Sequence, residues 1–217
     1  MPLRNVYFYL VLAIIIMSVG FGLKVFNKKT AEVQFGTIST GLKSYSTGTP
    51  DIGGEYSLIN QDGKAVSNNT YLGKYTLILF GFTFCPDICP NTLATFSSAL
   101  ELLGKDAEKV KPIFVTVDPA RDTPENLKLY LIHFHKNFDG LTGSLAQIEH
   151  VKKIFRIYAV KSQQDEPNTQ NYLMDHSAVG YLLGPDGKYI TFFRYGAEAE
   201  AILTKLKKFL QVTYRSD

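Results

Sequence analysis

The sequence predicts an α/β fold in which helices cover both faces of a mixed β-sheet and an extra β-hairpin precedes the first buried strand. Three observations favour this fold. Residues 75–82 (YTLILFGF) and 112–117 (PIFVTV) are continuous apolar runs, which are typical of strands buried on both faces. A segment with apolar residues at helical spacing follows each run. Residues 55–66 and 177–196 carry tight-turn residues between short apolar stretches, which predicts two hairpins.

The N-terminal 50 residues are predicted to lie outside the folded domain. From Val6 to Leu23 the chain has 18 residues without a charge, about enough for a helix to cross a hydrocarbon core of roughly 30 Å. We interpret residues 1–23 as one transmembrane helix that serves as a membrane anchor. A cleaved signal peptide is the alternative, although no clear small-residue cleavage site follows. Residues 24–50, rich in Ser, Thr and Gly, are predicted to be a linker, and residues 51–217 the domain.

The charges beside the predicted anchor favour a cytoplasmic domain. Lys24, Lys28 and Lys29 follow the apolar run, whereas only Arg4 and the amino terminus precede it. The positive-inside rule would then keep the domain in the cytoplasm. No Arg-rich, acid-poor presequence comes before the run, so a mitochondrial import signal is not predicted.

The net charge of +3 arises from the N-terminal region and not from the domain. Residues 1–50 hold five Lys or Arg and one acid, so that residues 51–217 hold 18 bases and 19 acids. A balanced domain without a basic stripe predicts no binding of nucleic acid.

The elements of the domain follow from its turn residues and apolar spacing. Asp62-Gly63 turns the first hairpin. Pro90 is expected to open the helix after residues 75–82. Pro124, with Asp122 or Thr123 as cap, is expected to open the helix after residues 112–117.

A third helix is predicted at about 145–157, followed by a short strand at 158–160. Pro185-Asp186-Gly187 turns the second hairpin, and an amphipathic helix closes the chain. Each of three helices has an inner apolar stripe. In the first helix it is Leu93, Phe96, Leu100 and Leu103, and in the second it is Leu127, Leu131, Phe134 and Phe138. In the closing helix it is Ala199, Ile202, Leu203, Leu206 and Leu210. The order of these strands and helices along the chain is consistent with a thioredoxin-like fold that carries an extra N-terminal hairpin.

The chain has two cysteines, Cys85 and Cys89, and both lie at the predicted strand-to-helix turn in FGFTFCPDICP. A helix N-terminus stabilises a thiolate, which is both a nucleophile and a metal ligand. The pair therefore predicts either thiol–disulfide exchange or a soft-metal site. Ordinary packing or a structural disulfide is the alternative, although such a disulfide would close a very small loop and gain little entropy. Thioredoxin-type redox enzymes have two residues between their cysteines, whereas this pair has three.

His176 is the candidate for a third ligand. It lies where a polar, irregular segment leads into a predicted buried strand, an entry expected beside the cysteine turn. Asp175 could orient its ring, and Met174 is a softer but weaker alternative ligand. The other three histidines are predicted to lie on the surface: His133, His135 and His150.

Two thiolates and one imidazole suit copper, particularly Cu(I) in a three-coordinate site. Zinc would bind the same atoms but normally takes four ligands, and Asp87 between the cysteines could supply a fourth contact.

Three motifs, FGFTFCPDICP, VTVDPARDTPE and DHSAVGYLLGPDGKY, resemble in order and distance those of the Sco/SenC family of copper-binding, thioredoxin-like assembly proteins. The hairpin segment GGEYSLINQDGKAV is similar too, and the resemblance covers about residues 50–212. It implies that Cys85, Cys89 and His176 bind copper, as Cu(I) and also as Cu(II). It also implies that Asp118 and Asp122 form a D-P-x-x-D loop and helix-cap element near the site.

The resemblance further implies a copper chaperone that delivers the ion to the CuA centre of cytochrome c oxidase subunit 2. Other copper chaperones or thiol reductases would be further partners. The alternative function is that of an enzyme: a thiol–disulfide reductase with Cys85 and Cys89 as catalytic redox pair, or a peroxidase-like thiol enzyme. Pro167 is the nearest proline before His176, so the cis-proline that thioredoxins place before the corresponding strand is not visible.

Family members have a single N-terminal anchor and a domain outside the cytoplasm. This location is the opposite of the one that the lysines after the apolar run favour. A domain built for copper and thiol exchange fits an oxidising compartment. We therefore predict a single-pass protein of the bacterial inner membrane, in preference to a mitochondrial one, with its domain facing the periplasm.

Overall fold

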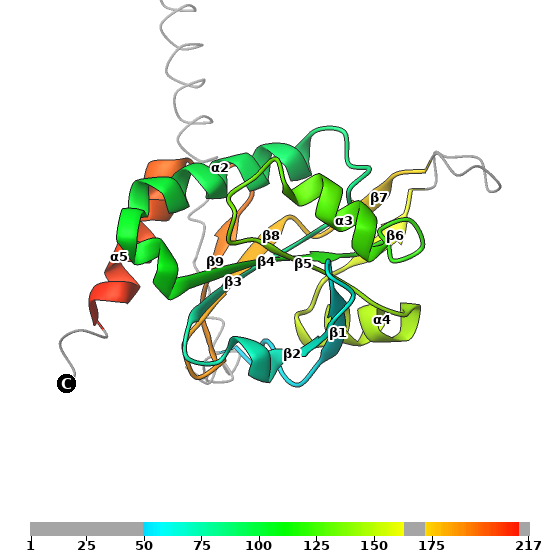
Figure 1. The fold of residues 1–217 in the computed structure, drawn as a ribbon, viewed down its shortest axis with the longest axis horizontal. Helices are drawn as coiled ribbons and strands as arrows, with labels where there is room; N and C mark the ends of the chain where they lie inside the picture. Colours follow the sequence, from blue (N-terminus) through cyan, green and yellow to red (C-terminus); the bar gives the residue numbers. More distant parts are fainter. Residues whose placement is uncertain (1–49, 163–171, 213–217) are drawn as a thin grey trace, which may run out of the picture. The chain divides into compact units, whose positions relative to one another are not determined.

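A computed structural model describes residues 50–162 and 172–212 of the chain (Figure 1). The predicted anchor, residues 1–23, and the linker up to residue 49 lie outside the described residues. Within the described part, none of the helices has the length and apolar character needed to cross a membrane.

The domain is built on a seven-stranded mixed sheet with the strand order β2-β1-β5-β4-β3-β8-β9 (Figure 1). The three inner strands β3, β4 and β5 are parallel, whereas β1 pairs antiparallel with β5 and β8 antiparallel with β3. The strands are β1 (Ser57–Asn60), β2 (Ala65–Ser67), β3 (Tyr75–Gly81), β4 (Val110–Thr116), β5 (Asp139–Thr142), β8 (Val179–Leu183) and β9 (Tyr189–Arg194). Every residue of β3 is buried, as its continuous apolar run predicted.

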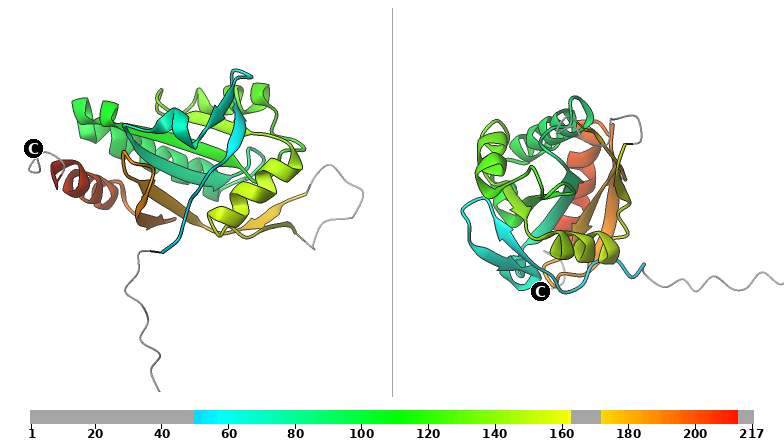
Figure 2. Two further views of the ribbon diagram at one scale, coloured as in Figure 1. Left: turned by 90° about the horizontal axis from the view of Figure 1, so that it is seen from below. Right: turned by 90° about the vertical axis from the view of Figure 1, so that its right-hand side faces the viewer.

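Helices cover both faces of this sheet, as predicted. The α-helices are α2 (Ile88–Leu103), α3 (Pro124–Leu131), α4 (Leu145–Ile154) and α5 (Ala199–Val212), and two short 3-10 helices are η1 (Asn68–Tyr71) and η2 (Gly104–Lys109). One core lies between the sheet and α2, α3 and α5. The other lies between the sheet and α4, which Figure 2 shows on the opposite side of the sheet.

The two predicted hairpins are confirmed. In β1–β2 the Asn60 side chain accepts hydrogen bonds from the backbone N–H groups of Asp62 and Lys64 (3.1 and 2.9 Å), and Gly63 has a φ of +74°. In β8–β9 the turn places Gly187 at a φ of +76°. Both glycines occupy the left-handed region that other residues rarely adopt.

Several helix boundaries differ from the predictions. Pro90 is the third residue of α2, where a missing N–H is still tolerated because the first N–H groups of a helix have no intrahelical acceptor. Thr123, and not Asp122, caps α3 by accepting a hydrogen bond from the Asn126 backbone N–H (3.2 Å).

The C-terminal ends of two helices come earlier than expected. α3 ends at Leu131, so that Phe134 and Phe138 occupy turns, although both remain at least partly buried against the core. His133 and His135 therefore do not lie on a helix. α4 ends at Ile154 instead of residue 157.

Two strands were not predicted. β5 fills the position between β4 and β1. β7 (Met174–His176) pairs antiparallel with β6 (Ala159–Lys161), close to the predicted strand at 158–160. These two strands form a separate two-stranded sheet, so His176 lies on a short ladder outside the main sheet.

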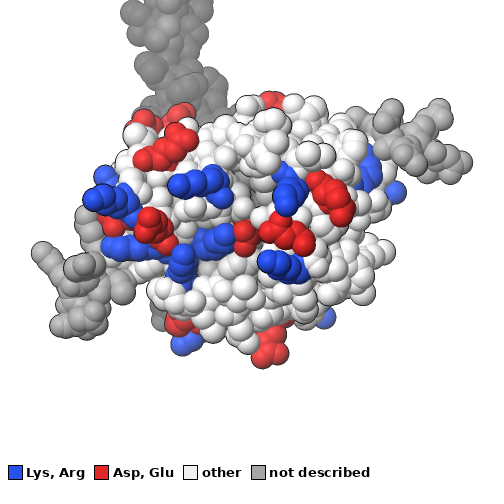
Figure 3. Space-filling view, viewed as in Figure 1, with Lys and Arg blue, Asp and Glu red and all other residues white. Residues whose placement is uncertain are grey.

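Basic and acidic side chains are interspersed on the face of the domain shown in Figure 3. On the left of that view several Lys and Arg side chains lie side by side, with acidic side chains next to them.

Candidate metal and thiol site

The cysteine loop connects the end of β3 to the start of α2. The Cys85 backbone N–H donates to the Phe82 carbonyl oxygen (3.2 Å), which turns the chain tightly after the strand. Cys89 is the second residue of α2, and its backbone N–H donates to Cys85 Sγ (3.4 Å). The first turn of α2 thus directs an N–H group at the Cys85 sulfur, as the position at a helix N-terminus predicted.

The two thiols differ in exposure. Both are free, but Cys89 is 2% exposed whereas Cys85 is half-buried. Gly81, the last residue of β3, makes room for Cys89. A Cβ atom on Gly81 would lie 2.7 Å from Cys89 Sγ and 2.8 Å from a ring carbon of Phe114.

The thiols also differ in acidity. The Cys89 side chain, as hydrogen-bond donor, lowers the pKa of Cys85 to about 5, and backbone N–H groups at the start of α2 contribute to this lowering. The same interaction and burial raise the pKa of Cys89 well above its ordinary value. At neutral pH the reduced pair therefore holds a thiolate at Cys85 and a thiol at Cys89.

His176 faces the buried thiol. Its Nε2 lies 3.7 Å from Cys89 Sγ, and its Nδ1 lies 3.0 Å from the Ser177 carbonyl oxygen. With the proton on Nδ1, this nitrogen donates to the Ser177 carbonyl oxygen and leaves Nε2, beside Cys89 Sγ, as the nitrogen that can bind a metal. The ring also makes edge contacts with Phe82 and Tyr195.

The polar neighbours expected of this site are placed elsewhere. Asp175 is exposed, and the Ser177 carbonyl contacts the His176 ring in its place. The exposed Asp87 accepts a hydrogen bond from Asn91 Nδ2 (2.6 Å), so we do not count it among the candidate ligands.

Cys85 and His176 each contact Cys89, which links the three predicted ligands in a row. Among the described residues, no group of three or more His, Cys, Asp and Glu side chains is close enough together to hold a metal ion as it stands. The donor set of two sulfurs and one imidazole fits a soft ion, and these side chains would have to move closer together to share it.

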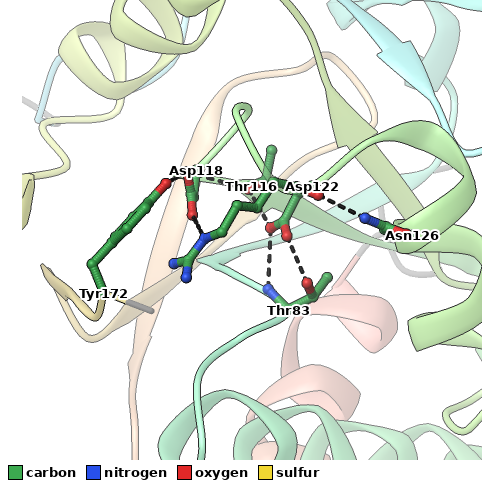
Figure 4. A network of polar contacts seen from close by, with 7 residues as sticks. Thr83, Thr116, Asp118, Asp122, Asn126 and Tyr172 are labelled. Carbon is green, nitrogen blue, oxygen red and sulfur yellow. Dashed lines mark hydrogen bonds and ion pairs between the residues drawn. The ribbon is translucent and has the colours of Figure 1, made fainter. Parts of the chain in front are cut away.

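Asp122 fixes the cysteine loop to the end of β4. Its buried carboxylate accepts hydrogen bonds from the Thr83 N–H (3.1 Å), the Thr83 hydroxyl (2.6 Å) and the Thr116 hydroxyl (2.6 Å) (Figure 4). Burial raises the pKa of Asp122, and the hydrogen bonds from Thr116 and Thr83 oppose that rise.

Asp118 fixes the segment that leads into β7. It accepts a hydrogen bond from the Tyr172 hydroxyl (2.7 Å; Figure 4) and forms an ion pair with Arg121 Nε (2.5 Å). Sequence reasoning placed Asp118 and Asp122 near the site but missed Arg121 and Tyr172. Those two lie 51 positions apart in the chain, and neither carries a signal of its own.

The SCO1/SenC family model matches residues 44–211. The chain belongs to the SCO1/SenC family. It is 42% identical to the protein sco1 of Schizosaccharomyces pombe over 154 residues, which cover 70% of this chain and 59% of that protein. It is also 42% identical to an SCO2-like protein of Rickettsia felis, over 72% of this chain and 76% of that protein.

The domain also resembles solved structures of the family. The copper-bound structure of Bradyrhizobium japonicum ScoI is 42% identical and has a TM-score of 0.67, covering 73% of this chain and 99% of that one. The thioredoxin-like fold predicted from the sequence is therefore confirmed. The relatives include Rickettsia proteins and proteins whose names place them in mitochondria.

Proposed function

We propose that this SCO1/SenC protein is a membrane-anchored copper chaperone. It binds one copper ion through Cys85, Cys89 and His176 and delivers it to the CuA centre of cytochrome c oxidase subunit 2. The observation that carries the proposal is the contact of 3.7 Å between His176 Nε2 and Cys89 Sγ. This contact adds an imidazole to the thiol pair, which disulfide exchange does not require. The relative at 42% identity was solved with copper bound, which supports copper as the ion.

The two thiols contribute differently to copper binding. Cys85 is already a thiolate at neutral pH, whereas the Cys89 thiol must lose its proton when the ion binds. Binding therefore releases protons, and it requires the reduced pair because a disulfide holds no such ion. Cys85 is the more exposed sulfur and is the first ligand that a thiolate of the acceptor subunit can replace.

A thiol–disulfide reductase is the second candidate. The observation that favours it is Cys85, which combines a pKa of about 5 with partial exposure, as an attacking thiolate requires. In this function Cys85 would attack a disulfide of the oxidase subunit and Cys89 would resolve the mixed disulfide.

Titration of the reduced full-length chain with Cu(I), against a competing chelator, tests the chaperone proposal. We expect one tightly bound ion. His176→Ala should weaken binding by about tenfold or more, and either cysteine-to-serine change should weaken it further, because thiolate is the softer ligand. His133→Ala is the matched control, since His133 is exposed outside the site. Equal affinity of His176→Ala and the wild type would exclude the histidine from the ligand set.

Oxidase assembly in cells separates the two functions. His176→Ala should impair assembly, and added copper should partly restore it by mass action. Reduction of a disulfide by the purified chain should change much less. Normal assembly with His176→Ala, together with cysteine variants that fail at any copper supply, would favour the reductase.

We further propose that residues 1–23 anchor the chain in the bacterial inner membrane and that the domain faces the periplasm. A reporter that is active only in the periplasm, fused after Asp217, should be active. Activity only from a cytoplasmic reporter would instead agree with the orientation given by Lys24, Lys28 and Lys29.

A further inference from the structure

One buried cation joins the two segments that carry the candidate copper ligands. Arg121 lies in the loop after β4 and pairs with Asp118, and their side chains are only 11% and 3% exposed. Its guanidinium carbon lies 3.6 Å from the centroid of the Tyr172 ring and 4.5 Å from that of Phe84. At these distances a guanidinium is attracted to the face of an aromatic ring.

The two rings belong to the two segments that carry the candidate ligands. Phe84 directly precedes Cys85 in the cysteine loop, whereas Tyr172 precedes β7, the strand that ends at His176. The Tyr172 hydroxyl also donates to Asp118, the ion-pair partner of Arg121 (Figure 4). One ion pair therefore contacts both segments at once.

β7 is not a strand of the main sheet, although it leads within two residues into β8, which is. This strand has three residues and pairs with β6 in a separate two-stranded sheet. The cysteines, in contrast, follow a strand buried at the centre of the main sheet. The ring contacts of His176 with Phe82 and Tyr195 help to set its distance from the cysteines. The contacts around Arg121 add a second link, from the cysteine loop to the segment before β7.

We infer that Arg121 and Tyr172 are positioning residues that hold His176 within reach of the cysteine pair. The inference rests on the proposed copper-binding function and adds two residues outside the proposed ligand set. They act by raising the fraction of molecules in which the histidine can bind the same ion as the cysteines.

The test compares two substitutions of Tyr172. Tyr172→Leu removes the ring and should weaken Cu(I) binding by the reduced full-length chain by about tenfold, the range of one buried cation–ring contact. Tyr172→Phe keeps the ring and loses only the hydroxyl that donates to Asp118, so it should weaken binding less than Tyr172→Leu does.

Arg121→Lys gives an independent variant, because it keeps the charge beside Asp118 but loses the planar group that faces both rings. We expect it to weaken binding in the same direction as Tyr172→Leu. If Tyr172→Leu fails to fold, Arg121→Lys serves as the test variant in its place. Lys205→Met is the control for loss of a cation near a ring, since Lys205 lies on α5, 5.0 Å from the Phe193 ring centroid.

The readout that identifies positioning is a double-mutant cycle with His176→Ala. If the ring acts through the histidine, Tyr172→Leu should have little further effect once the imidazole is absent. In the Cu(II)-loaded chain, the nitrogen hyperfine coupling of the histidine should also weaken in Tyr172→Leu and persist in Tyr172→Phe.

An equal loss of affinity in both backgrounds, or no loss with either Tyr172→Leu or Arg121→Lys, would overturn the positioning role and leave the copper ligands as proposed. No effect of His176→Ala itself would remove the ligand assignment and the inference together. The two failures are therefore distinguishable.

Discussion

Gly81→Ala should displace the buried thiol and disturb both stability and acidity at the cysteine pair. The added methyl group would lie 2.7 Å from Cys89 Sγ and 2.8 Å from the Phe114 ring, whereas ordinary contacts fall at 3.4–4 Å. The sulfur must therefore move by about 0.7 Å. Phe114 is 1% exposed and has little free space into which to retreat.

The expected cost follows from this crowding. Inserting a methyl group into a well-packed core costs about 1–3 kcal/mol, and the smaller conformational freedom of unfolded alanine returns about 0.4–1 kcal/mol. We therefore expect the free energy of unfolding of the reduced chain to fall by roughly 1–2 kcal/mol. With a urea dependence of about 2 kcal/mol/M, the unfolding midpoint should fall by roughly 0.5–1 M.

Cys85 reports the displacement directly. Because the Cys89 side chain is the largest cause of the low pKa of Cys85, moving its sulfur should raise that pKa from about 5 toward the ordinary value of 9.0. The pH dependence of alkylation of the native chain measures this change. Gly140→Ala on β5 is the control. Its methyl group would lie 2.6 Å from Leu131 Cδ1 of α3, so it crowds the core without contacting a cysteine. An unchanged midpoint together with an unchanged alkylation profile for Gly81→Ala would refute the packing argument.

Three further predictions concern the same loop and its supports. In the wild-type reduced chain, the alkylation rate of Cys85 should rise with pH through about 5 and then level off, because the thiolate reacts and the thiol does not; a profile centred near pH 8 or 9 would contradict this. Asp122→Ala should lower the free energy of unfolding by about 2–4 kcal/mol in urea melts, since three donors of Thr83 and Thr116 lose their buried acceptor. Thr123→Ala should cost about 1 kcal/mol through loss of the α3 cap, measured by thermal melting, while Thr123→Ser should cost little.

The strongly patterned elements were predictable from the sequence. The apolar run of β3, the turn glycines of both hairpins and the amphipathic spacing of α5 each follow from a local rule, and the structure contains all three. β5 could not be found in this way. Its residues are DGLT, and Asp and Gly disfavour strands, so the pairing with β4 and β1 is imposed by the fold.

Several residues of the candidate site were predictable from the sequence. Cys85, Cys89 and His176 are chemically conspicuous, and the structure places His176 Nε2 3.7 Å from Cys89 Sγ. Their role as copper ligands stays a prediction. The ring of Tyr172 and the guanidinium of Arg121 look like ordinary surface or core side chains in the sequence. Their contact joins distant segments, which no local pattern records. The end of α3 was missed because Phe134 and Phe138 keep a helical apolar spacing while lying in turns.

The unequal burial of the two sulfurs also determines how oxidative damage would proceed. A peroxide meets the half-exposed thiolate of Cys85 first and converts it to a sulfenic acid. The neighbouring Cys89 thiol can then condense with that group, releasing water and forming a disulfide. A disulfide can be reduced again, whereas a sulfinic acid generally cannot. The buried Cys89 thiol therefore protects Cys85 from irreversible oxidation.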